Sequence, residues 1–93
     1  MIFELHFSKE AKDKLKELKE NKGLAKRYKA VEKALKNLQQ NPRHPSLQTH
    51  PYASLNGPNG EKVFEAYAEQ DTPSAYRIFF YYSTSRGTIM ILT

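Results

Sequence analysis

Two segments in the first half of the chain carry apolar residues at helical spacing. In the first, Ala11, Leu15 and Leu18 lie four and three residues apart, so they share one face of a helix. In the second, apolar residues recur at intervals of four, three, four and three, and these are Leu24, Tyr28, Val31, Leu35 and Leu38. Each buried leucine contributes roughly 1.5–3 kcal/mol on leaving water, so both faces must pack on another element. The pattern predicts an antiparallel helical hairpin.

Capping and breaking residues separate these helices from the rest of the chain. Ser8 can cap the first helix, because its hydroxyl accepts a hydrogen bond from a free backbone N–H. The Asn-Lys-Gly segment 21–23 ends this helix, and we expect Gly23 to adopt a left-handed conformation there. The Asn-Pro pair 41–42 ends the second helix, because the residue before proline is disfavoured in the α region.

Four further segments are predicted as β-strands, because they are rich in aromatic and β-branched residues or alternate in polarity. They are residues 2–7, 62–69, 75–83 and 88–92. Turn residues at 71–74 and 83–87 separate the last three, which therefore form an antiparallel meander. The predicted order is β-α-α-β-β-β, with the helical hairpin packed on one face of a four-stranded, mainly antiparallel sheet. This arrangement belongs to the α+β class.

The segment 41–61 is predicted as a long loop between the second helix and the meander. It holds four of the five prolines and two of the four glycines. A loop of this length without regular structure is uncommon in a compact domain, so we expect it to be either functional or mobile. It also carries His44 and His50. The side chains of both histidines can reach the face of the sheet.

Length and composition limit the class of protein. A chain of 93 residues is predicted to form one domain, residues 1–93. There is no cysteine, so no disulfide forms and no thiolate can act as nucleophile or metal ligand. The N-terminus lacks the basic and apolar regions of a signal peptide, and no apolar run approaches the ~20 residues that span a membrane. We therefore expect a cytoplasmic protein that does not contact membranes.

The formal charge of +5 is unevenly distributed. Between Lys9 and Lys36 the chain has ten lysines and Arg27 against five acidic residues, a local net charge of +6. On the second helix the lysines opposite the apolar stripe are Lys26, Lys29, Lys33 and Lys36. Such a basic half favours a polyanion or an acidic partner, although a lysine-rich solvated helix surface explains it equally well.

Three motifs follow one another along the chain in a specific order. Residues 7–15, Phe-Ser-Lys-Glu-Ala-Lys-Asp-Lys-Leu, form a strand end that leads into a lysine-rich helix. Residues 41–47, Asn-Pro-Arg-His-Pro-Ser-Leu, are a proline-rich segment after the second helix. Residues 75–81, Ala-Tyr-Arg-Ile-Phe-Phe-Tyr, combine Tyr-Arg with a hydrophobic strand. Over essentially the whole chain this order resembles the RelE/ParE family, the toxins of bacterial type II toxin–antitoxin systems.

The resemblance implies a toxin that a cognate antitoxin neutralises, in a toxin–antitoxin hetero-oligomer. RelE-like members bind the ribosomal A site and cut mRNA there, which would make the ribosome and mRNA partners of this chain. The alternative is a non-catalytic or degenerate binding module, either a ParE-like gyrase poison or a protein that binds only its antitoxin. A third possibility is a basic nucleic-acid-binding domain unrelated to toxicity.

The RelE-like reaction needs neither a metal nor another cofactor. The 2′-hydroxyl of the mRNA attacks the adjacent phosphate, which requires a base, an acid for the leaving 5′-oxygen, and cations that stabilise the phosphorane. Arg77 matches the phosphate-stabilising arginine of the family strand, and its planar fork suits a phosphate. The structural alternative is a salt bridge from Arg77 to Glu65, Glu69 or another acidic residue across the sheet.

Three residues are candidate proton carriers beside Arg77. Glu65 and Tyr67 occupy strand positions where RelE itself has lysines, and both also suit a solvated strand face. Glu65 can act as a base, whereas Tyr67 can stack on a nucleobase or donate a proton. His50 titrates near neutrality and is the third candidate. Relatives place a further catalytic residue, often His, Tyr or Arg, after the last strand, and the 93 residues here contain no such segment.

Several basic and aromatic residues are candidates for binding the RNA. The basic ones are Lys26, Lys29, Lys33, Lys36, Arg43 and Arg86, which suit phosphates. Tyr76, Tyr81 and Tyr82 can stack on nucleobases or instead form core and cross-strand pairs. The spacing of His44 and His50 is not that of a zinc site, so no metal is expected, and His6 is interpreted as a structural histidine.

Overall fold

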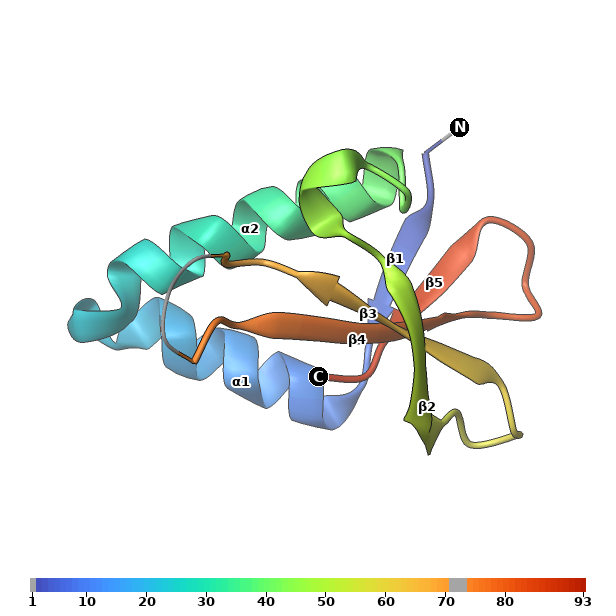
Figure 1. Cartoon of the computed structure of the whole chain (residues 1–93). Helices are drawn as coiled ribbons and strands as arrows, with labels where there is room; N and C mark the ends of the chain where they lie inside the picture. Colours follow the sequence, from blue (N-terminus) through green and yellow to red (C-terminus); the bar gives the residue numbers. More distant parts are fainter. Residues whose placement is uncertain (1, 71–73) are drawn as a thin grey trace.

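The computed structural model describes residues 2–70 and 74–93 and shows an α+β fold (Figure 1). Its elements are β1 (Glu4–Phe7), α1 (Lys9–Glu20), the 3₁₀ turn η1 (Lys22–Leu24), α2 (Ala25–Gln40), the 3₁₀ turn η2 (Pro45–Leu47), β2 (His50–Asn56), β3 (Lys62–Tyr67), β4 (Arg77–Tyr82) and β5 (Thr88–Ile91). The predicted class and the helical hairpin are confirmed. The predicted turn at 71–74 lies, for residues 71–73, outside the described part of the chain.

The sheet has five strands in the order β1-β5-β4-β3-β2, so the predicted four-stranded sheet is wrong by one strand. The additional strand is β2, within the segment predicted to be a loop. Pro51 has no N–H to donate and is tolerated in a strand only at an edge, which is where β2 lies. None of the seven β2 residues is buried, so its sequence carries no hydrophobic alternation. β1 and β5 run parallel, and the other pairs are antiparallel.

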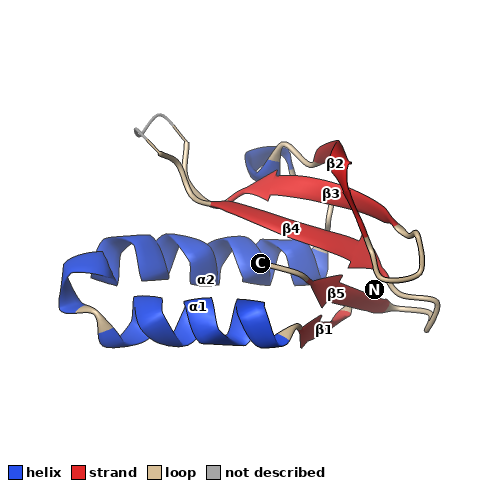
Figure 2. Ribbon diagram, turned by 90° about the horizontal axis from the view of Figure 1, so that it is seen from below, coloured by secondary structure: helices blue, strands red, loops and turns tan. Residues whose placement is uncertain are grey.

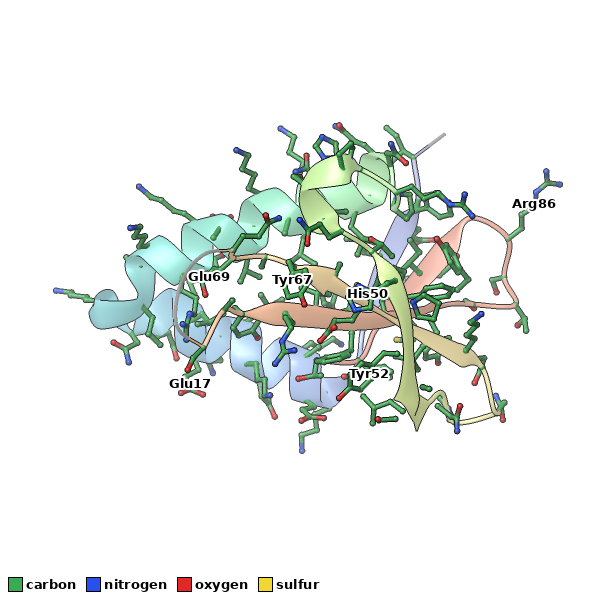
Figure 3. All side chains as sticks on the ribbon, in the orientation of Figure 1. Glu17, His50, Tyr52, Tyr67, Glu69 and Arg86 are labelled. Carbon is green, nitrogen blue, oxygen red and sulfur yellow. The ribbon has the colours of Figure 1, made fainter. Side chains whose placement is uncertain are left out.

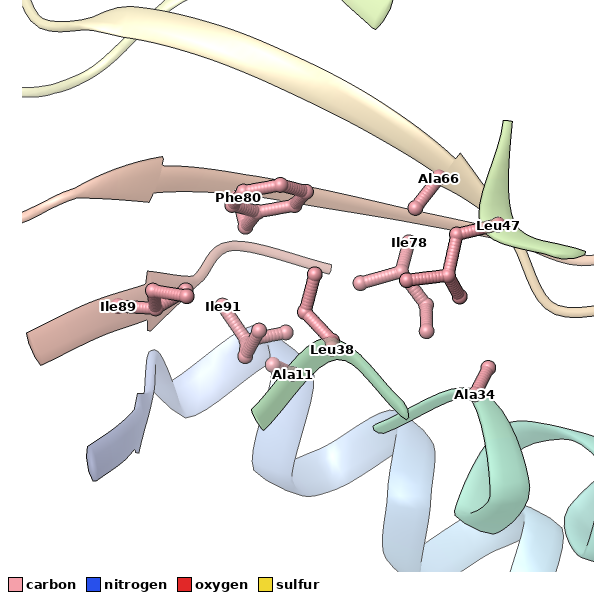
Figure 4. Packing of buried hydrophobic residues seen from close by; sticks show 9 residues of the cluster. All are labelled: Ala11, Ala34, Leu38, Leu47, Ala66, Ile78, Phe80, Ile89 and Ile91. Atoms are coloured by element: carbon pink, nitrogen blue, oxygen red, sulfur yellow. The ribbon is translucent and has the colours of Figure 1, made fainter. Parts of the chain in front are cut away.

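Both helices lie against one face of the sheet (Figure 2). Between the layers the core side chains converge from both sides (Figure 4), and they are Ala11, Ala34, Leu38, Leu47, Ala66, Ile78, Phe80, Ile89 and Ile91. The apolar stripes that predicted the hairpin supply the helical part of this cluster. The sheet therefore has a covered face and a second face that is free of helices.

The ends of α1 are held by polar side chains. The hydroxyl of Ser8 accepts from the Ala11 N–H at 3.1 Å, as predicted, and donates to the Leu92 carbonyl at 2.7 Å. The prediction for Gly23 is wrong, because it lies in the 3₁₀ turn η1 and is not among the described residues with positive φ. Instead, the Asn21 side chain accepts from the Gly23 N–H at 2.9 Å and stabilises the turn.

Alternation along β3 and β4 decides which residues reach each face. Phe64, Ala66 and Ile78 project toward the helices, so Glu65 and Arg77 project to the other face. β2 is the edge strand next to β3, so His50 at its start lies beside this other face. Within the described residues, no helix has the length and apolar character needed to cross a bilayer.

Candidate functional site

Strand register brings the candidate catalytic residues together on the helix-free face. His50 of β2 stands opposite Glu65 of β3, and Tyr67 of β3 stands opposite Arg77 of β4. Residues two apart on one strand share a face, so these four side chains form two adjacent rows. The structure therefore gathers all four predicted residues into one site. The sequence could not predict that His50 lies opposite Glu65, because this pairing depends on the unpredicted strand β2.

Glu65 is the centre of this site. It is the one charged side chain in the buried core of the described residues, with a relative exposure of 3%. Its Oε1 lies 2.7 Å from Nε2 of His50, and its Oε2 lies 3.0 Å from Nη1 of Arg77. A carboxylate is costly to bury unless cations and hydrogen bonds compensate it. The two flanking cations supply that compensation.

The two oxygens of Glu65 are not equally satisfied. Oε1 has a hydrogen-bond partner in His50, whereas Oε2 has an ion-pair contact to Arg77 without hydrogen-bond geometry. A buried oxygen without a hydrogen-bond partner is rare in folded proteins. Oε2 thus keeps unused capacity to accept a proton or a hydrogen bond.

The contacts of His50 favour its imidazolium form. Its Nδ1 lies 2.7 Å from the Gln48 carbonyl oxygen, and its Nε2 lies 2.7 Å from the Glu65 carboxylate. A carbonyl oxygen and an ionised carboxylate only accept, so with Glu65 ionised both hydrogen bonds form when both ring nitrogens carry a proton. The Gln48 carbonyl and then the Glu65 carboxylate raise the pKa of His50 above 6.5, against the opposing effects of desolvation and of the Arg77 charge.

Arg77 is paired but not sealed in the core. The ion pair with Glu65 is the structural alternative considered for this residue, and it is present. However, 49% of the Arg77 side chain remains exposed, and so does 43% of the His50 side chain. One buried carboxylate therefore contacts two half-exposed basic side chains, so the accessible side of the cluster is basic.

Tyr67 links this cluster to a groove along α2. Its ring centroid is 5.9 Å from that of His50, and Figure 3 shows both side chains over the middle of the sheet. Tyr67 also lines a groove of about 310 Å³ together with Lys33 of α2. On the other side, Arg43 lines a cleft that includes His50. Of the predicted RNA-binding residues, Lys33 and Arg43 are thus the two that share a cleft with the site.

The other predicted RNA-binding residues lie away from the cluster. Lys26, Lys29 and Lys36 are exposed on α2, on the covered side of the sheet. Arg86 projects from the turn between β4 and β5, far from the other side chains labelled in Figure 3. The structure does not bring these four residues into the same site as Arg77.

The remaining tyrosines and histidines have distinct environments. Tyr81 is buried, and the ring of Tyr76 lies under the Arg27 guanidinium with 6.0 Å to the ring centroid. Tyr82, by contrast, is 40% exposed. His6 is an exposed residue that contacts Glu4 at 3.3 Å. Among residues 2–70 and 74–93 no group of three or more acidic or histidine side chains is placed to hold a metal ion.

Comparison with known proteins yields no match to this chain, neither to a family model, nor to a curated protein, nor to a solved structure. The resemblance to the RelE/ParE family therefore stays a prediction from the sequence motifs.

Proposed function

We propose that the chain is a RelE-like toxin that cuts ribosome-bound mRNA in the cytoplasm, with Arg77 and His50 on the scissile phosphate. The observation that carries this proposal is the buried Glu65 carboxylate between two half-exposed cations. Charge-assisted hydrogen bonds from a preoriented guanidinium and an imidazolium are well suited to the anionic phosphorane. A cognate antitoxin would mask this face until the toxin is released.

The proposed reaction is a transesterification within the RNA. The 2′-oxygen forms a bond to phosphorus while the bond from phosphorus to the 5′-oxygen breaks, which leaves a 2′,3′-cyclic phosphate and a 5′-hydroxyl. His50, whose contacts favour the imidazolium, supplies the proton to the leaving 5′-oxygen in this scheme. Arg77 lies diagonally across the strands from it and neutralises the non-bridging oxygens.

Glu65 has two roles in this scheme. In the free protein it orients both cations, because its side chain is buried and both oxygens contact them. When a phosphate draws Arg77 outward, Oε2 loses its ion-pair contact and becomes available for the 2′-hydroxyl proton. Oε2 already lacks a hydrogen-bond partner, so this change breaks no hydrogen bond in the protein.

Tyr67 and the flanking clefts would position the RNA strand. The Tyr67 ring stands beside His50 and offers a face on which a nucleobase can stack. Lys33 in the groove on one side and Arg43 in the cleft on the other can contact phosphates. These contacts would select single-stranded RNA by its backbone and bases without a metal.

A second candidate function is a non-catalytic binding module. The same ion pairs favour it, because a buried carboxylate neutralised by two cations also stabilises a fold without performing chemistry. Such a protein would poison gyrase in the manner of ParE or would bind only its antitoxin.

Programmed ribosomes separate these two functions. Purified protein is added to ribosomes that hold either an all-RNA message or one with 2′-deoxynucleotides throughout the A-site codon. The nuclease proposal expects cleavage of the first message within that codon, a 2′,3′-cyclic phosphate end, and no cleavage of the second. If both messages stay intact and expression arrests growth with DNA damage, the gyrase alternative holds. Harmless expression with intact messages would indicate a module that binds only its antitoxin.

A further inference from the structure

A separate cleft opens next to the first residues of β2, and its chemistry differs from that of the Glu65 cluster. Its volume is about 570 Å³, which falls within the range of small-ligand pockets, roughly 300–1,000 Å³. The segment after α2 forms one wall with Arg43 and His44, and β3 and β4 form the other with Lys62, Phe64 and Tyr82. Among the described residues that line it, none is acidic.

The aromatic wall of this cleft is rigidly supported. The ring of Tyr82 packs against three other rings, with centroid distances of 5.5 Å to Phe64, 5.8 Å to Phe80 and 6.1 Å to Phe3. Nevertheless Tyr82 is 40% exposed. Its outward part therefore presents a preorganised surface to which a planar group can stack.

Two cations flank this aromatic wall. The amino group of Lys62 lies 5.8 Å from the ring centroid of Phe64. Arg43 lies close enough to Tyr82 that its charge lowers the phenol pKa, against the larger effect of burial, which raises it. Neither cation forms an ion pair among the described residues, so both charges are available to a ligand.

We infer that this cleft binds one nucleotide of single-stranded RNA, with the base stacked on Tyr82 and the phosphate between Arg43 and Lys62. An exposed aromatic face between unpaired cations is the combination that single-strand binders use. An acidic protein segment would need the cations but not the supported ring. The choice of RNA as ligand rests on the proposed function, whereas the cleft itself does not.

His50 connects the cleft to the Glu65 cluster. It lines the cleft and also contacts the Glu65 carboxylate, so the two sites meet at the start of β2. Phe64 and Glu65 are adjacent on β3 and project to opposite faces, so the two sites lie on either side of the sheet. An RNA strand that occupies both would pass around the edge of the sheet at His50.

A tryptophan reporter tests the cleft without requiring catalysis. The chain has no tryptophan, so Tyr82→Trp introduces a single fluorophore into the aromatic wall. The probe is a 2′-O-methyl RNA pentanucleotide, which lacks the attacking hydroxyl and cannot be cut. We expect it to quench the emission of Tyr82→Trp, and an abasic oligomer of equal charge to leave the emission unchanged. Leu55→Trp is the matched control, because Leu55 is similarly exposed, at 41%, near the far end of β2.

Charge variants test RNA binding without the Tyr82→Trp variant, so this test does not depend on whether that variant folds. Arg43→Gln and Lys62→Gln are each expected to weaken binding of the labelled pentanucleotide about 3–10-fold at low salt. Each should also lower the slope of log affinity against log salt by about 0.7, the value for one phosphate contact on a single strand. Lys12→Gln removes one exposed charge from α1 and is expected to change the affinity less than about twofold.

The outcomes separate this inference from the proposed function. Quenching and charge effects without any mRNA cleavage would support the cleft and contradict the nuclease. Cleavage with no quenching, and with all three charge variants equal, would overturn the cleft and leave the nuclease standing. The inference is also overturned if an acidic peptide displaces the RNA at equal concentration.

Discussion

His50 on β2 and Glu65 on β3 stand opposite each other in the sheet, and their side chains meet with 2.7 Å between Nε2 and Oε1. β2 has no buried residue of its own, and its register shifts between Pro51 and Asn56. The polar contact therefore ties the edge strand to the sheet at the same point where the candidate site is formed. The geometry of the site therefore depends on this carboxylate, whereas β2 is also held by its pairing with β3 and by the contact of Tyr52 with Phe79, whose ring centroids are 4.9 Å apart.

Replacement of Glu65 by glutamine is expected to destabilise the fold. The amide is nearly isosteric and can still accept from His50, but its NH₂ group would face the Arg77 guanidinium, donor against donor. We expect Glu65→Gln to lower the free energy of unfolding by about 1–3 kcal/mol, measured by chemical denaturation. Glu32→Gln, at an exposed position of α2, should change it by less than about 0.5 kcal/mol. Equal stability of the two variants would show that the contacts of the buried Glu65 carboxylate with His50 and Arg77 do not stabilise the fold.

The His50 pair predicts a defined pH dependence. Because its pKa is raised above 6.5, the folded state favours the imidazolium. Its stabilising contribution is fully present below pH 6.5 and is lost as the pH rises through the folded-state pKa. Wild type should therefore lose stability relative to His50→Gln over this window, measured by denaturation at a series of pH values. NMR titration should show the His50 pKa above 6.5 in wild type and a lower one in Glu65→Gln. An unchanged His50 pKa in that variant would refute the contribution of the carboxylate.

Another ion pair anchors the start of α2 to the segment that follows β3. Nε of Arg27 donates to Oε1 of Glu69 at 2.8 Å, and the same oxygen accepts from the Tyr76 N–H at 2.9 Å. The Glu69 side chain is only 14% exposed, so this pair is worth more than a surface one. We expect Arg27→Met to lower the free energy of unfolding by about 1 kcal/mol. Lys26→Met, at the preceding exposed position, serves as the control and should have no measurable effect.

The packing of α2 on the sheet predicts a large cost for truncating Leu38. Its side chain is fully buried, at 0% exposure, so Leu38→Ala removes apolar contacts and leaves a cavity. The expected loss in free energy of unfolding is about 2–5 kcal/mol. Leu55→Ala makes the same chemical change at an exposed position and is expected to cost less than about 0.5 kcal/mol. Similar values for both variants would show that Leu38 is not part of the core.

The sequence predicts the elements whose side chains are buried on one side. Exposing the apolar stripe of α2 or the hydrophobic residues of β4 and β5 to water would cost much free energy. Their spacing along the sequence is therefore set by the need to bury one side of each element. β2 lacks this signal because it lies at an edge and is exposed, and Pro51 marks it as a non-strand in any local reading. Long-range pairing with β3 decides its conformation, and no local pattern encodes that pairing.

In the candidate site, too, some residues could be predicted from local sequence and others depend on long-range pairing. Arg77 could be selected from its motif, and Glu65 could be named as its possible partner, because both lie on predicted neighbouring strands. The contact between His50 and Glu65 could not be predicted, since it requires the register of β2. Lys62 was also missed as a cleft residue. Its position two before Phe64 places both on one face, and that spacing is the signal that could have identified it.

The rate of mRNA cleavage by Arg77→Ala tests the central claim most directly. Single-turnover cleavage on programmed ribosomes is measured for wild type, Arg77→Ala and Arg86→Ala, the last removing an exposed arginine outside the site. If Arg77 stabilises the phosphorane, Arg77→Ala should cut about 100-fold or more slowly, while Arg86→Ala stays within about fivefold of wild type. Cleavage by Arg77→Ala at the wild-type rate, or no cleavage by the wild-type protein, would contradict the account.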